Sequence, residues 1–447
     1  MASVGEANKV IAPKTAWYMV SVLTVAYMFS FIDRTILSLM VGPIRADLEI
    51  SDTQFSLLHG LAFALFYTML GVPIARLADR KNRRNLIALG VAFWSVMTAA
   101  CGLAKSFGQL FFARIGVGVG EAALSPAAYS MISDLFPKEK LGKALGIYSS
   151  GVYIGIGLSF ILGGLLLSTL ANAGAIELPL LGTLKPWQLT FIIVGLPGLL
   201  VALWIMTLTE PARSRGHVVG GVPVAQVFRY FNRFRTTYLL HFIGFSMVTL
   251  LYNAILSWSA ELFIRIHGMA RSEVGTILGF IILIFGSLGI ICGGALSDYF
   301  AKRGYRDAPI RAAIFGICLL VPFAVVAPLI ESPLLGLVLF CPLMFAGSFP
   351  FGPAATALQL ISPPAMRAQF SAFYLFCVNL TGIGLGATAT AVVTDFVFAD
   401  DMKLHYSMSL VAGVGGVLSL ALLAWCMKSF AGTVEAQEVE PASGADN

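Results

Sequence analysis

Charged side chains are scarce in this sequence. Of its 447 residues only 12% are Asp, Glu, Lys or Arg, whereas 58% are hydrophobic. A soluble globular domain carries roughly 25% charged residues, because they cover the surface that water contacts. A bilayer removes that need, since lipid solvates an apolar exterior. The composition therefore excludes a water-soluble protein of this size and predicts a chain that is largely embedded in a membrane.

The sequence also lacks the motifs of the common enzyme and metal classes. It contains no GxSxG, no nucleotide-binding loop and no CxxC pair, and its six cysteines and five histidines are scattered. The net charge of +6 lies in short loops between apolar runs rather than in a continuous basic patch. We therefore expect no enzymatic activity, no cofactor, no metal site and no nucleic-acid partner.

What the chain does have is long hydrophobic runs. Each can cross about 30 Å of hydrocarbon as a helix, and lipid offers no partner for free amides, so the backbones must be helical. The first run contains no small-residue cleavage site, so we expect it to be retained. We predict an all-α membrane protein with twelve spans at 16–40, 54–76, 86–104, 108–133, 143–168, 187–209, 237–263, 274–300, 309–330, 334–358, 369–394 and 404–428.

Lysine and arginine are distributed unevenly between the two sides of these spans. Twenty-one of the 29 lie on one side, six lie on the other, and Arg34 and Arg114 lie inside spans. Basic loops remain in the cytoplasm. We predict a multi-pass protein of the inner or plasma membrane with both termini cytoplasmic, which requires an even number of spans.

The two halves of the chain are related by a weak repeat. Residues 125–128 (SPAA) parallel residues 352–355 (GPAA), and residues 75–79 (ARLAD) echo residues 294–298 (GALSD). Such a repeat predicts two pseudo-symmetric six-helix bundles. We expect them at residues 1–209 and 237–430, joined by a cytoplasmic linker at 210–236 and followed by a disordered cytoplasmic tail at 431–447.

Several stretches carry a resemblance to a known family. The basic loop at 79–84 (DRKNRR), its counterpart at 298–306, and 114–120 (RIGVGVG) resemble the signature elements of the major facilitator superfamily. Within that superfamily, residues 31–34 (FIDR), the same basic loop, and 118–136, which opens on GVGEA and closes on SDLF, resemble the spinster-like lipid transporters. The resemblance covers essentially the whole chain and is strongest in the first half.

The resemblance implies a secondary transporter that works by alternating access, with proton coupling and a sphingolipid or lysophospholipid as substrate. It also implies a conformational-switch loop, in which Asp79, Arg80, Arg83 and Asp298 form cytoplasmic pairs in one conformation and release them in the other. An asparagine where Asn82 stands is common in the spinster-like subgroup, whereas the superfamily at large has glycine there.

Four ionisable side chains lie inside spans of the first half: Asp33, Arg34, Arg114 and Glu121. An unpaired charge costs roughly 2.5–3.5 kcal/mol in a helix centre on insertion scales, so we expect these groups to pair and to face a cavity. A buried carboxylic acid near an arginine can titrate near neutral pH, because burial and the cation act in opposite directions. We predict that Asp33 and Glu121 carry protons and that Arg34 and Arg114 bind an anion. The alternative is a static network that only fixes helix packing.

The second half offers weaker candidates for substrate binding, namely Tyr252, Asn253 and Asn379. Each is also the kind of residue that forms an interhelical hydrogen bond. This half has no counterpart of the four charges, so we expect a cavity that is charged on one side and apolar on the other. That cavity suits an amphiphilic lipid. A small organic anion is the alternative, since the two arginines suit a carboxylate as well. We also expect the chain to act as a monomer.

Small residues recur every three or four positions in the fifth and eighth spans. Such stripes allow helices to approach closely and to slide, and in this superfamily these two helices lie between the halves. The residues are Gly151, Gly155, Ser159 and Gly163 in the fifth span, and Gly286, Gly289 and Gly293 in the eighth.

Overall fold

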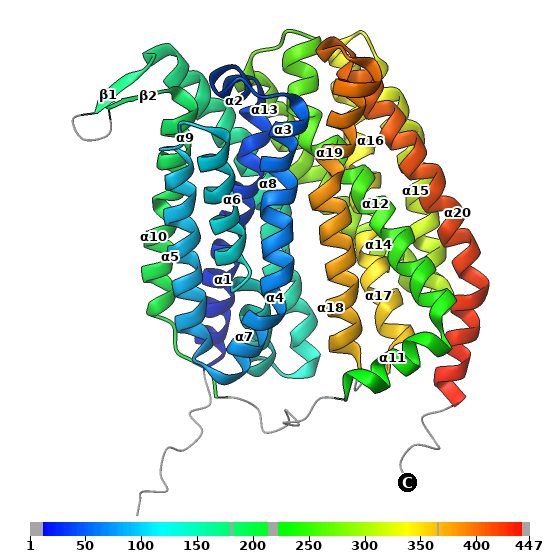
Figure 1. Cartoon of the computed structure of the whole chain (residues 1–447). Coiled ribbons are helices and arrows are strands. Elements are labelled where there is room, and N and C mark those ends of the chain that lie inside the picture. The colour runs from blue at the N-terminus through cyan, green and yellow to red at the C-terminus, as the bar shows by residue number, and fades with distance from the viewer. Residues whose placement is uncertain (1–11, 179–181, 213–221, 364–365, 440–447) are drawn as a thin grey trace, which may run out of the picture.

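A computed structural model of the chain describes residues 12–178, 182–212, 222–363 and 366–439. In this part of the chain, twelve helices are long and apolar enough to cross a membrane, as the sequence predicted. They form two bundles that stand side by side, one from each half of the chain (Figure 1). The all-α fold with two six-helix bundles is therefore confirmed.

The first bundle contains a short hairpin besides its helices. Strands β1 (Ile176–Leu178) and β2 (Gly182–Leu184) pair antiparallel between the fifth and sixth spans. A 3-10 segment (Ile36–Leu39) and a π-helical turn (Leu57–Leu61) interrupt the first two spans. The helices are α1 (Pro13–Thr35), α2 (Val41–Leu48), α3 (Asp52–Ser56), α4 (Ala62–Arg80), α5 (Arg83–Cys101), α6 (Phe107–Glu121), α7 (Leu124–Leu135), α8 (Lys138–Ala173), α9 (Pro186–Gly195) and α10 (Pro197–Met206).

The second bundle has more irregular turns. Its π-helical turns are Leu262–Ile266, Ile282–Gly286, Asn379–Gly384 and Val393–Phe398, and its 3-10 segments are Ala327–Leu329 and Asp401–Lys403. Turns of the π type are often associated with functional sites. The helices are α11 (Val224–Arg233), α12 (Arg235–Glu261), α13 (Arg271–Ile281), α14 (Ser287–Lys302), α15 (Ala308–Val326), α16 (Pro333–Ser348), α17 (Phe351–Ile361), α18 (Arg367–Val378), α19 (Leu385–Val392) and α20 (Leu404–Val439).

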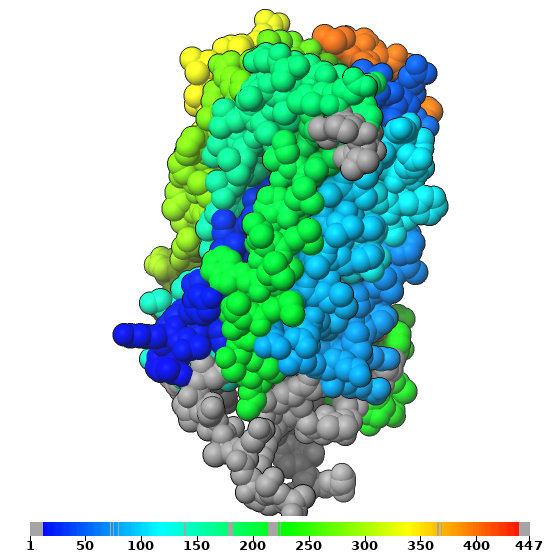
Figure 2. Space-filling view, turned by 90° about the vertical axis from the view of Figure 1, so that its left-hand side faces the viewer, coloured from blue at the N-terminus to red at the C-terminus, as the bar shows by residue number. Residues whose placement is uncertain are grey.

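The two ends of the molecule are distinguished by short elements. Helices α2 and α3 and the hairpin lie at one end, here called the α3 end, and α11 lies at the other, the α11 end (Figure 1). Helix α1 begins and α20 finishes at the α11 end (Figure 1). On the outer flank of the first bundle, α9 and α10 pack along α5, and α10 also contacts α1 (Figure 2).

The local sequence explains where helices α3 and α5 begin. Ser51 and Gln54 form a capping box at the start of α3, in which each side chain bonds the backbone of the other residue. Asn82 caps α5, since its side-chain oxygen accepts a bond from the backbone N–H of Asn85 at 2.9 Å. Glycine could not supply that oxygen, so the asparagine has a structural role here.

The chain continues as helix where disorder was expected. Residues 431–439 belong to α20, because tertiary contacts hold this segment. The hydroxyls of Thr433 and Thr237 lie 2.8 Å apart, and Gln437 donates to the backbone oxygen of Ile361 at 3.0 Å. The expectation of a disordered tail from residue 431 is therefore wrong up to Val439, and residues 440–447 lie outside the described residues. Part of the predicted linker likewise forms α11 and the start of α12.

Besides the predicted Gly286, on which a Cβ atom would lie 2.6 Å from the ring of Tyr153, glycines that were not predicted bring the fifth and eighth spans together. A Cβ atom on Gly157 would lie 2.8 Å from the carbonyl oxygen of Gly279, and one on Gly275 would lie 2.4 Å from that of Phe160. By contrast, a Cβ on Gly155 would meet α1 of the same bundle, 2.6 Å from the oxygen of Met28. The predicted stripe in the fifth span thus packs within its own half, and the adjacent face forms the contact between halves.

Candidate functional site

A cavity of about 440 Å³ lies between the two bundles. Helices α1, α7 and α8 of the first half and α12, α17 and α18 of the second contribute to its walls. Its polar and charged lining residues are Arg34, Thr35, Ser38, His59, Ser125, Ser149, Thr249, Asn253, Ser257 and Asn379. Its aromatic lining residues are Tyr27, Phe31, Phe63, Tyr67, Tyr129, Tyr153, Tyr252, Phe351 and Tyr374.

Arg34 joins this cavity to a buried carboxylate. Its Nε donates to Oε2 of Glu121 at 2.7 Å, and its Nη2 lies 2.7 Å from the same oxygen. The Ser30 hydroxyl also donates to that oxygen at 2.7 Å. The Arg34 side chain is 12% exposed, whereas that of Glu121 is fully buried and its Oε1 is without a partner among the described residues. One guanidinium therefore contacts both the cavity and the acid behind it.

Three aromatic rings hold the Arg34 guanidinium in place. Its central carbon lies 4.7 Å from the ring centre of Phe31, 4.4 Å from that of Phe63 and 4.8 Å from that of Tyr67. A cation over an aromatic face is stabilised by the ring quadrupole, most strongly where water is excluded. This arrangement stabilises a cation inside the membrane without a second carboxylate.

Asp33 and Arg114 lie together but without an ion pair. Arg114 donates from Nη1 to the backbone oxygen of Asp33 at 3.2 Å and from Nε to the backbone oxygen of Leu58 at 3.4 Å. Arg114 Nη2 and Asp33 Oδ1 are buried, and neither has a hydrogen-bond partner among the described residues. The Asp33 carboxylate is near Trp94 and Thr98 of α5. The expected second acid–base pair is thus not formed in this conformation.

The predicted substrate-binding residues divide into two groups. Arg34, Tyr252, Asn253 and Asn379 all line the cavity, although they come from α1, α12 and the π-helical turn after α18. Arg114 does not line it: its side chain is completely buried, and its guanidinium carbon lies 5.8 Å from the ring centre of Phe63, which does line the cavity. The structure therefore separates the two arginines that the sequence treated as equivalent.

Sequence reasoning missed His59. This residue lies in the π-helical turn of the second span and lines the cavity, and its Nδ1 is buried without a partner among the described residues. Its position inside an apolar run was the available signal, because histidine is rare at membrane depth. Scattered histidines predict no metal cluster, but a single histidine can still line a cavity.

In this conformation, Arg83 of the predicted switch loop contacts the first bundle and the start of the linker. The buried Arg83 side chain pairs with Asp134 of the first bundle, bonds Glu210 at 2.8 Å, and donates to the backbone oxygen of Pro211 at 2.8 Å, both at the start of the predicted linker. Arg80 and Asp298 are exposed at the surface, and the side chain of Asp79 lies outside the described residues. Arg83 therefore holds the start of the linker against the first bundle in this conformation, and its part in a conformational switch stays a prediction.

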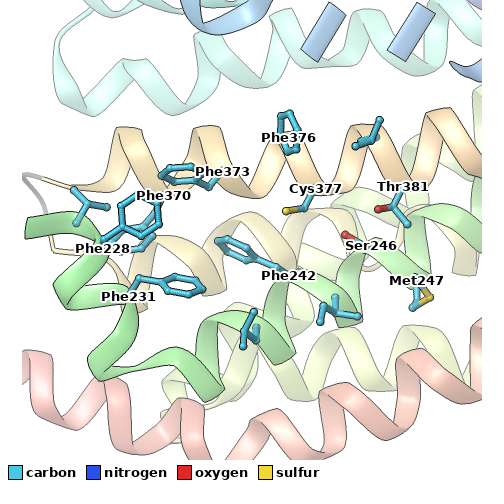
Figure 3. Close-up of a pocket in the computed structure, with 14 residues that line it drawn as sticks. Phe228, Phe231, Phe242, Ser246, Met247, Phe370, Phe373, Phe376, Cys377 and Thr381 are labelled. Atoms are coloured by element: carbon cyan, nitrogen blue, oxygen red, sulfur yellow. The ribbon is translucent and has the colours of Figure 1, made fainter. Parts of the chain in front are cut away.

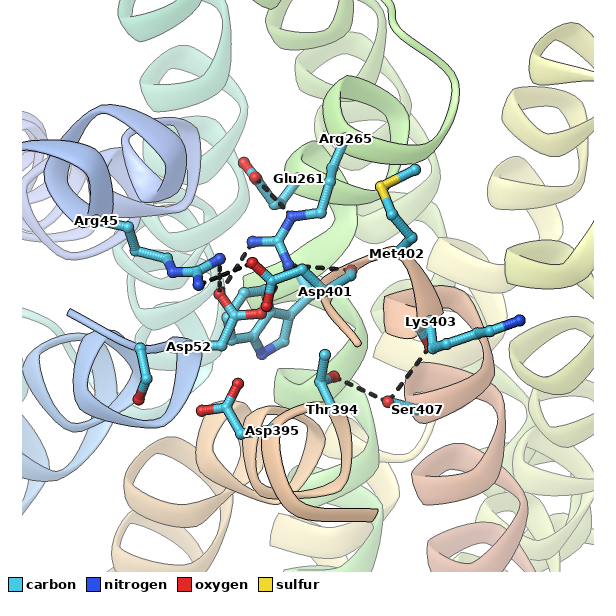
Figure 4. Close-up of polar contacts among 12 residues, drawn as sticks. Arg45, Asp52, Glu261, Arg265, Thr394, Asp395, Asp401, Met402, Lys403 and Ser407 are labelled. Carbon is cyan, nitrogen blue, oxygen red and sulfur yellow. Dashed lines mark hydrogen bonds and ion pairs between the residues drawn. The ribbon is translucent and has the colours of Figure 1, made fainter. Parts of the chain in front are cut away.

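The ion pairs that do join the halves gather at the opposite end. We call Arg45, Asp52, Glu261, Arg265 and Asp401 the α3-end ion cluster (Figure 4). Arg45 lies 2.9 Å from both Asp52 and Asp401, and Arg265 lies 2.7 Å from Asp52 and 3.0 Å from Glu261. Asp52 is fully buried between an arginine from each half. In the sequence, Arg45 and Arg265 are two of the six basic residues on the less basic side of the spans, and nothing in their positions predicts that they meet.

Two further contacts strengthen this closure. The backbone N–H of Thr53 donates to Asp395 at 2.7 Å, and the hydroxyls of Ser56 and Thr388 lie 3.1 Å apart. Carboxylate oxygens of Asp52, Asp395 and Asp401 lie within 4.8 Å of one another, a spacing that could hold a cation. The two arginines already supply the positive charge at that position, so the arrangement is one of salt bridges between protein groups.

The fold and the central cavity define a membrane transporter. The sequence profile of the Major Facilitator Superfamily matches residues 23–387, so the chain belongs to this superfamily of transporters and is not an enzyme.

Its relatives include proteins of several kinds. The chain is 28% identical to an MFS-type efflux pump of Mycolicibacterium smegmatis over 81% of each chain, and 27% identical to a probable L-galactonate transporter of Escherichia coli over 81% of this chain and 80% of that one. It also resembles the crystal structure of a bacterial homolog of the human lysosomal transporter spinster, in an inward-facing and unoccupied conformation. That match has a TM-score of 0.75 and 28% identity, and covers 95% of this chain and 98% of the other.

Proposed function

We propose that this chain is a proton-coupled secondary transporter of an amphiphilic lipid, such as a sphingolipid or a lysophospholipid, and that it works by alternating access. The observation that carries the proposal is the double contact of Arg34. Its guanidinium is bonded to buried Glu121 on one side and lines the central cavity on the other. A substrate anion and the Glu121 carboxylate therefore compete for the same cation.

This competition links proton and substrate occupancy. When Glu121 is ionised, it neutralises Arg34 through two short contacts. When Glu121 takes up a proton, its attraction for Arg34 falls, and the guanidinium becomes available to an anionic group in the cavity. Asp33 is the second proposed proton carrier, because its buried carboxylate lies beside Arg114 and each residue has an atom without a partner in the described part of the chain, which could engage in another conformation.

The character of the cavity supports an amphiphilic substrate. Arg34 supplies a positive charge on α1, whereas the walls from the second half carry uncharged groups such as Tyr252, Leu256 and Phe351. The volume of about 440 Å³ is within the roughly 300–1,000 Å³ of small-molecule sites. An anionic head on Arg34 would leave a hydrocarbon tail against the apolar wall, so we assign substrate contact to Arg34, Tyr252, Asn253 and Asn379.

The conformation and orientation follow from the same features. We propose that the basic α11 end is cytoplasmic, in accordance with the positive-inside rule, and that the chain resides in the inner or plasma membrane. The α3-end ion cluster then closes the outer side, and the resemblance to a structure described as inward-facing favours the same assignment. We take residues 1–209 and 237–430 as the two moving units, linked by residues 210–236, and propose that one chain suffices for transport.

A small organic anion remains the second candidate. The similar L-galactonate transporter favours it, and so do the hydroxyl and amide groups of Ser125, Ser257 and Asn253 in the cavity, which could bind a polyol chain. Arg34 would then bind the carboxylate. The rest of the mechanism would be unchanged.

Flux measurements separate the two candidates. Purified protein in proteoliposomes would be tested for uptake of lysophosphatidic acid, sphingosine-1-phosphate and galactonate, with and without an inward proton gradient. Lysophosphatidylcholine, which has no net negative charge, and the Arg34→Gln variant control for non-specific insertion of lipid. The proposal expects gradient-dependent flux of an anionic lipid. Flux of galactonate alone would replace the lipid by the organic anion, and flux that ignores the gradient would remove proton coupling.

A further inference from the structure

A second cavity lies away from the central one, between α12 and α18 near the α11 end. It encloses about 370 Å³ and is almost entirely apolar. Figure 3 shows Phe231 and Phe242 on one side of this groove and Phe370, Phe373 and Cys377 on the other. Its volume is comparable to that of the central cavity, but none of its lining residues is charged.

The groove opens to the lipid-facing surface of the bundle. Helices α12 and α18 lie side by side on the same face of the second bundle (Figure 1). Ile243 and Phe373, which line the groove, are 46% and 42% exposed, so these apolar groups are not covered by the protein itself. In a bilayer such a surface is in contact with acyl chains.

The groove and the central cavity use opposite sides of α18. Phe373 and Cys377 line the groove, whereas Tyr374 and Val378 line the central cavity. Each pair is one helical turn apart on its own side. An occupant of the groove would therefore lie outside the transport path but against the helix that forms part of its wall.

Helix α11 lines one end of the groove and carries basic residues on its other side. On one side of this helix Val227 is buried and Phe231 packs into the groove, while Arg229 and Arg233 are exposed on the other, and exposed Arg235 follows at the start of α12. The helix lies across the ends of α12 and α18 (Figure 1). An amphipathic helix with basic residues on its polar side lies at a membrane surface and attracts anionic lipid.

We propose that the groove is a binding site for one anionic phospholipid of the leaflet at the α11 end. One acyl chain occupies the space between α12 and α18, and the phosphate lies against Arg229, Arg233 and Arg235. The apolar groove fits the chain and the three arginines fit the head group, so both parts of the molecule find a complementary surface. The proposal rests on the assignment of the α11 end to a membrane surface and does not depend on the identity of the transported substrate.

Native mass spectrometry of the purified full-length protein tests the head-group contact. Phosphatidylglycerol and phosphatidylcholine with the same acyl chains would be added at equal concentration, and the lipid-bound fractions compared. We expect preferential retention of phosphatidylglycerol. The triple variant Arg229→Gln, Arg233→Gln, Arg235→Gln should weaken this retention by at least about tenfold, since each basic residue near the surface contributes to attraction of anionic lipid.

A matched triple variant controls for the general effect of charge. This variant removes three exposed basic residues of the same end that lie outside α11 and the groove. Its substitutions are Lys140→Gln, Lys302→Gln and Arg303→Gln. It should retain phosphatidylglycerol like the original protein. Equal loss in the two triple variants, or equal retention of the two lipids by the original protein, would mean non-specific annular lipid and would overturn the proposal.

Filling the groove tests the position of the acyl chain. Ile243→Trp should reduce phosphatidylglycerol binding, whereas Val417→Trp, at a 61% exposed position on α20, should leave it unchanged. Thermal unfolding would verify that both variants are folded. Retained binding in Ile243→Trp together with loss in Arg34→Gln would place the lipid in the central cavity and exclude the groove. None of these lipid-binding experiments measures transport, so a negative result would leave the proposed transport function standing.

Discussion

Arg114 donates a hydrogen bond to the backbone oxygen of Asp33 at 3.2 Å, while the carboxylate of Asp33 takes no part in that contact. Arg34, next to Asp33 in the sequence, instead forms the ion pair with Glu121 and reaches the cavity. The four intramembrane charges therefore form one complete pair and one incomplete one.

Arg34 and Arg114 should differ in what they support. Arg34→Gln should weaken binding of an anionic substrate by about 10–100-fold, because it removes a charge-assisted contact of roughly 1.5–3 kcal/mol. Arg114→Gln should instead lower the melting temperature by several degrees, since it removes bonds to the backbone oxygens of Asp33 and Leu58. Ligand titration and thermal unfolding of both variants provide the comparison. Equal effects on substrate binding would contradict the separation of the two roles.

Glu121→Gln should abolish uptake driven by a proton gradient while the protein remains folded. The amide cannot release a proton, and it removes the charge that holds Arg34. Uptake into proteoliposomes would be measured at two external pH values, with Asp33→Asn as a second variant. Glu273→Gln, which changes an exposed acid at the start of α13, is the control and should retain coupling. Gradient-driven uptake that persists in both Glu121→Gln and Asp33→Asn would remove the assignment of proton carriers.

Asp52→Asn should open the α3 end. The substitution removes the shared partner of Arg45 and Arg265, whose side chains are partly exposed. We therefore expect the equilibrium between a closed and an open α3 end to shift by about 1–3 kcal/mol toward the open state. Spin labels would be attached at exposed positions 105 and 331, in place of Lys105 and Glu331, in a chain whose native cysteines are replaced. Pulsed electron paramagnetic resonance would then measure the distance between the labels, and we expect a population with a longer distance. Asp47→Asn is the control, because Asp47 pairs with Lys185 within the first half. No change in Asp52→Asn would mean that the cluster does not hold the closure.

Gly275→Ala should slow transport strongly. Its new Cβ would lie 2.4 Å from the carbonyl oxygen of Phe160, so α8 and α13 would have to separate at the contact between the halves. We expect a fall of about tenfold in the uptake rate, in line with 1–3 kcal/mol for overpacking. Gly294→Ala adds the same methyl group where nothing lies within 4 Å and should transport normally. Similar rates in the two variants would show that close approach at Gly275 is unimportant.

Arg83→Gln should destabilise the first bundle. The buried guanidinium bonds Asp134, Glu210 and the backbone of Pro211, and breaking a buried pair typically costs about 3–5 kcal/mol. The melting temperature should therefore fall by several degrees, whereas Arg80→Gln, at an exposed position, should leave it unchanged. An unchanged melting temperature in Arg83→Gln, combined with an altered distance between the labelled halves, would contradict a structural role and support the predicted role of Arg83 in a switch.

Much of the fold could be predicted because it depends on local composition. Each span is a continuous apolar run, and lipid imposes helical structure on such a run whatever surrounds it. The tail was predicted less well. Residues 431–439 are polar enough to suggest disorder, but Thr433 and Gln437 contact neighbouring helices, and a contact between distant segments leaves no periodic signal in the sequence.

The site was predictable in part for the same reason. Arg34 and Glu121 stand out because a charge inside an apolar run needs a partner. The ion cluster at the α3 end was not predicted, since Arg45, Asp52 and Arg265 lie near span ends, where charges are common and solvent is close. Only their meeting across the two bundles gives them a shared role.

By itself, the sequence determined the twelve spans, the two-bundle architecture and the four intramembrane charges of the first half. The bilayer acts on each apolar segment separately, so these features depend on the local sequence of each segment. The tertiary structure decided which charges pair, which arginine reaches the cavity, and which end of the molecule is closed. Those outcomes depend on how helices that are far apart in the chain are oriented about their own axes. A shift of one position along a helix turns the side chain by about 100° around that axis.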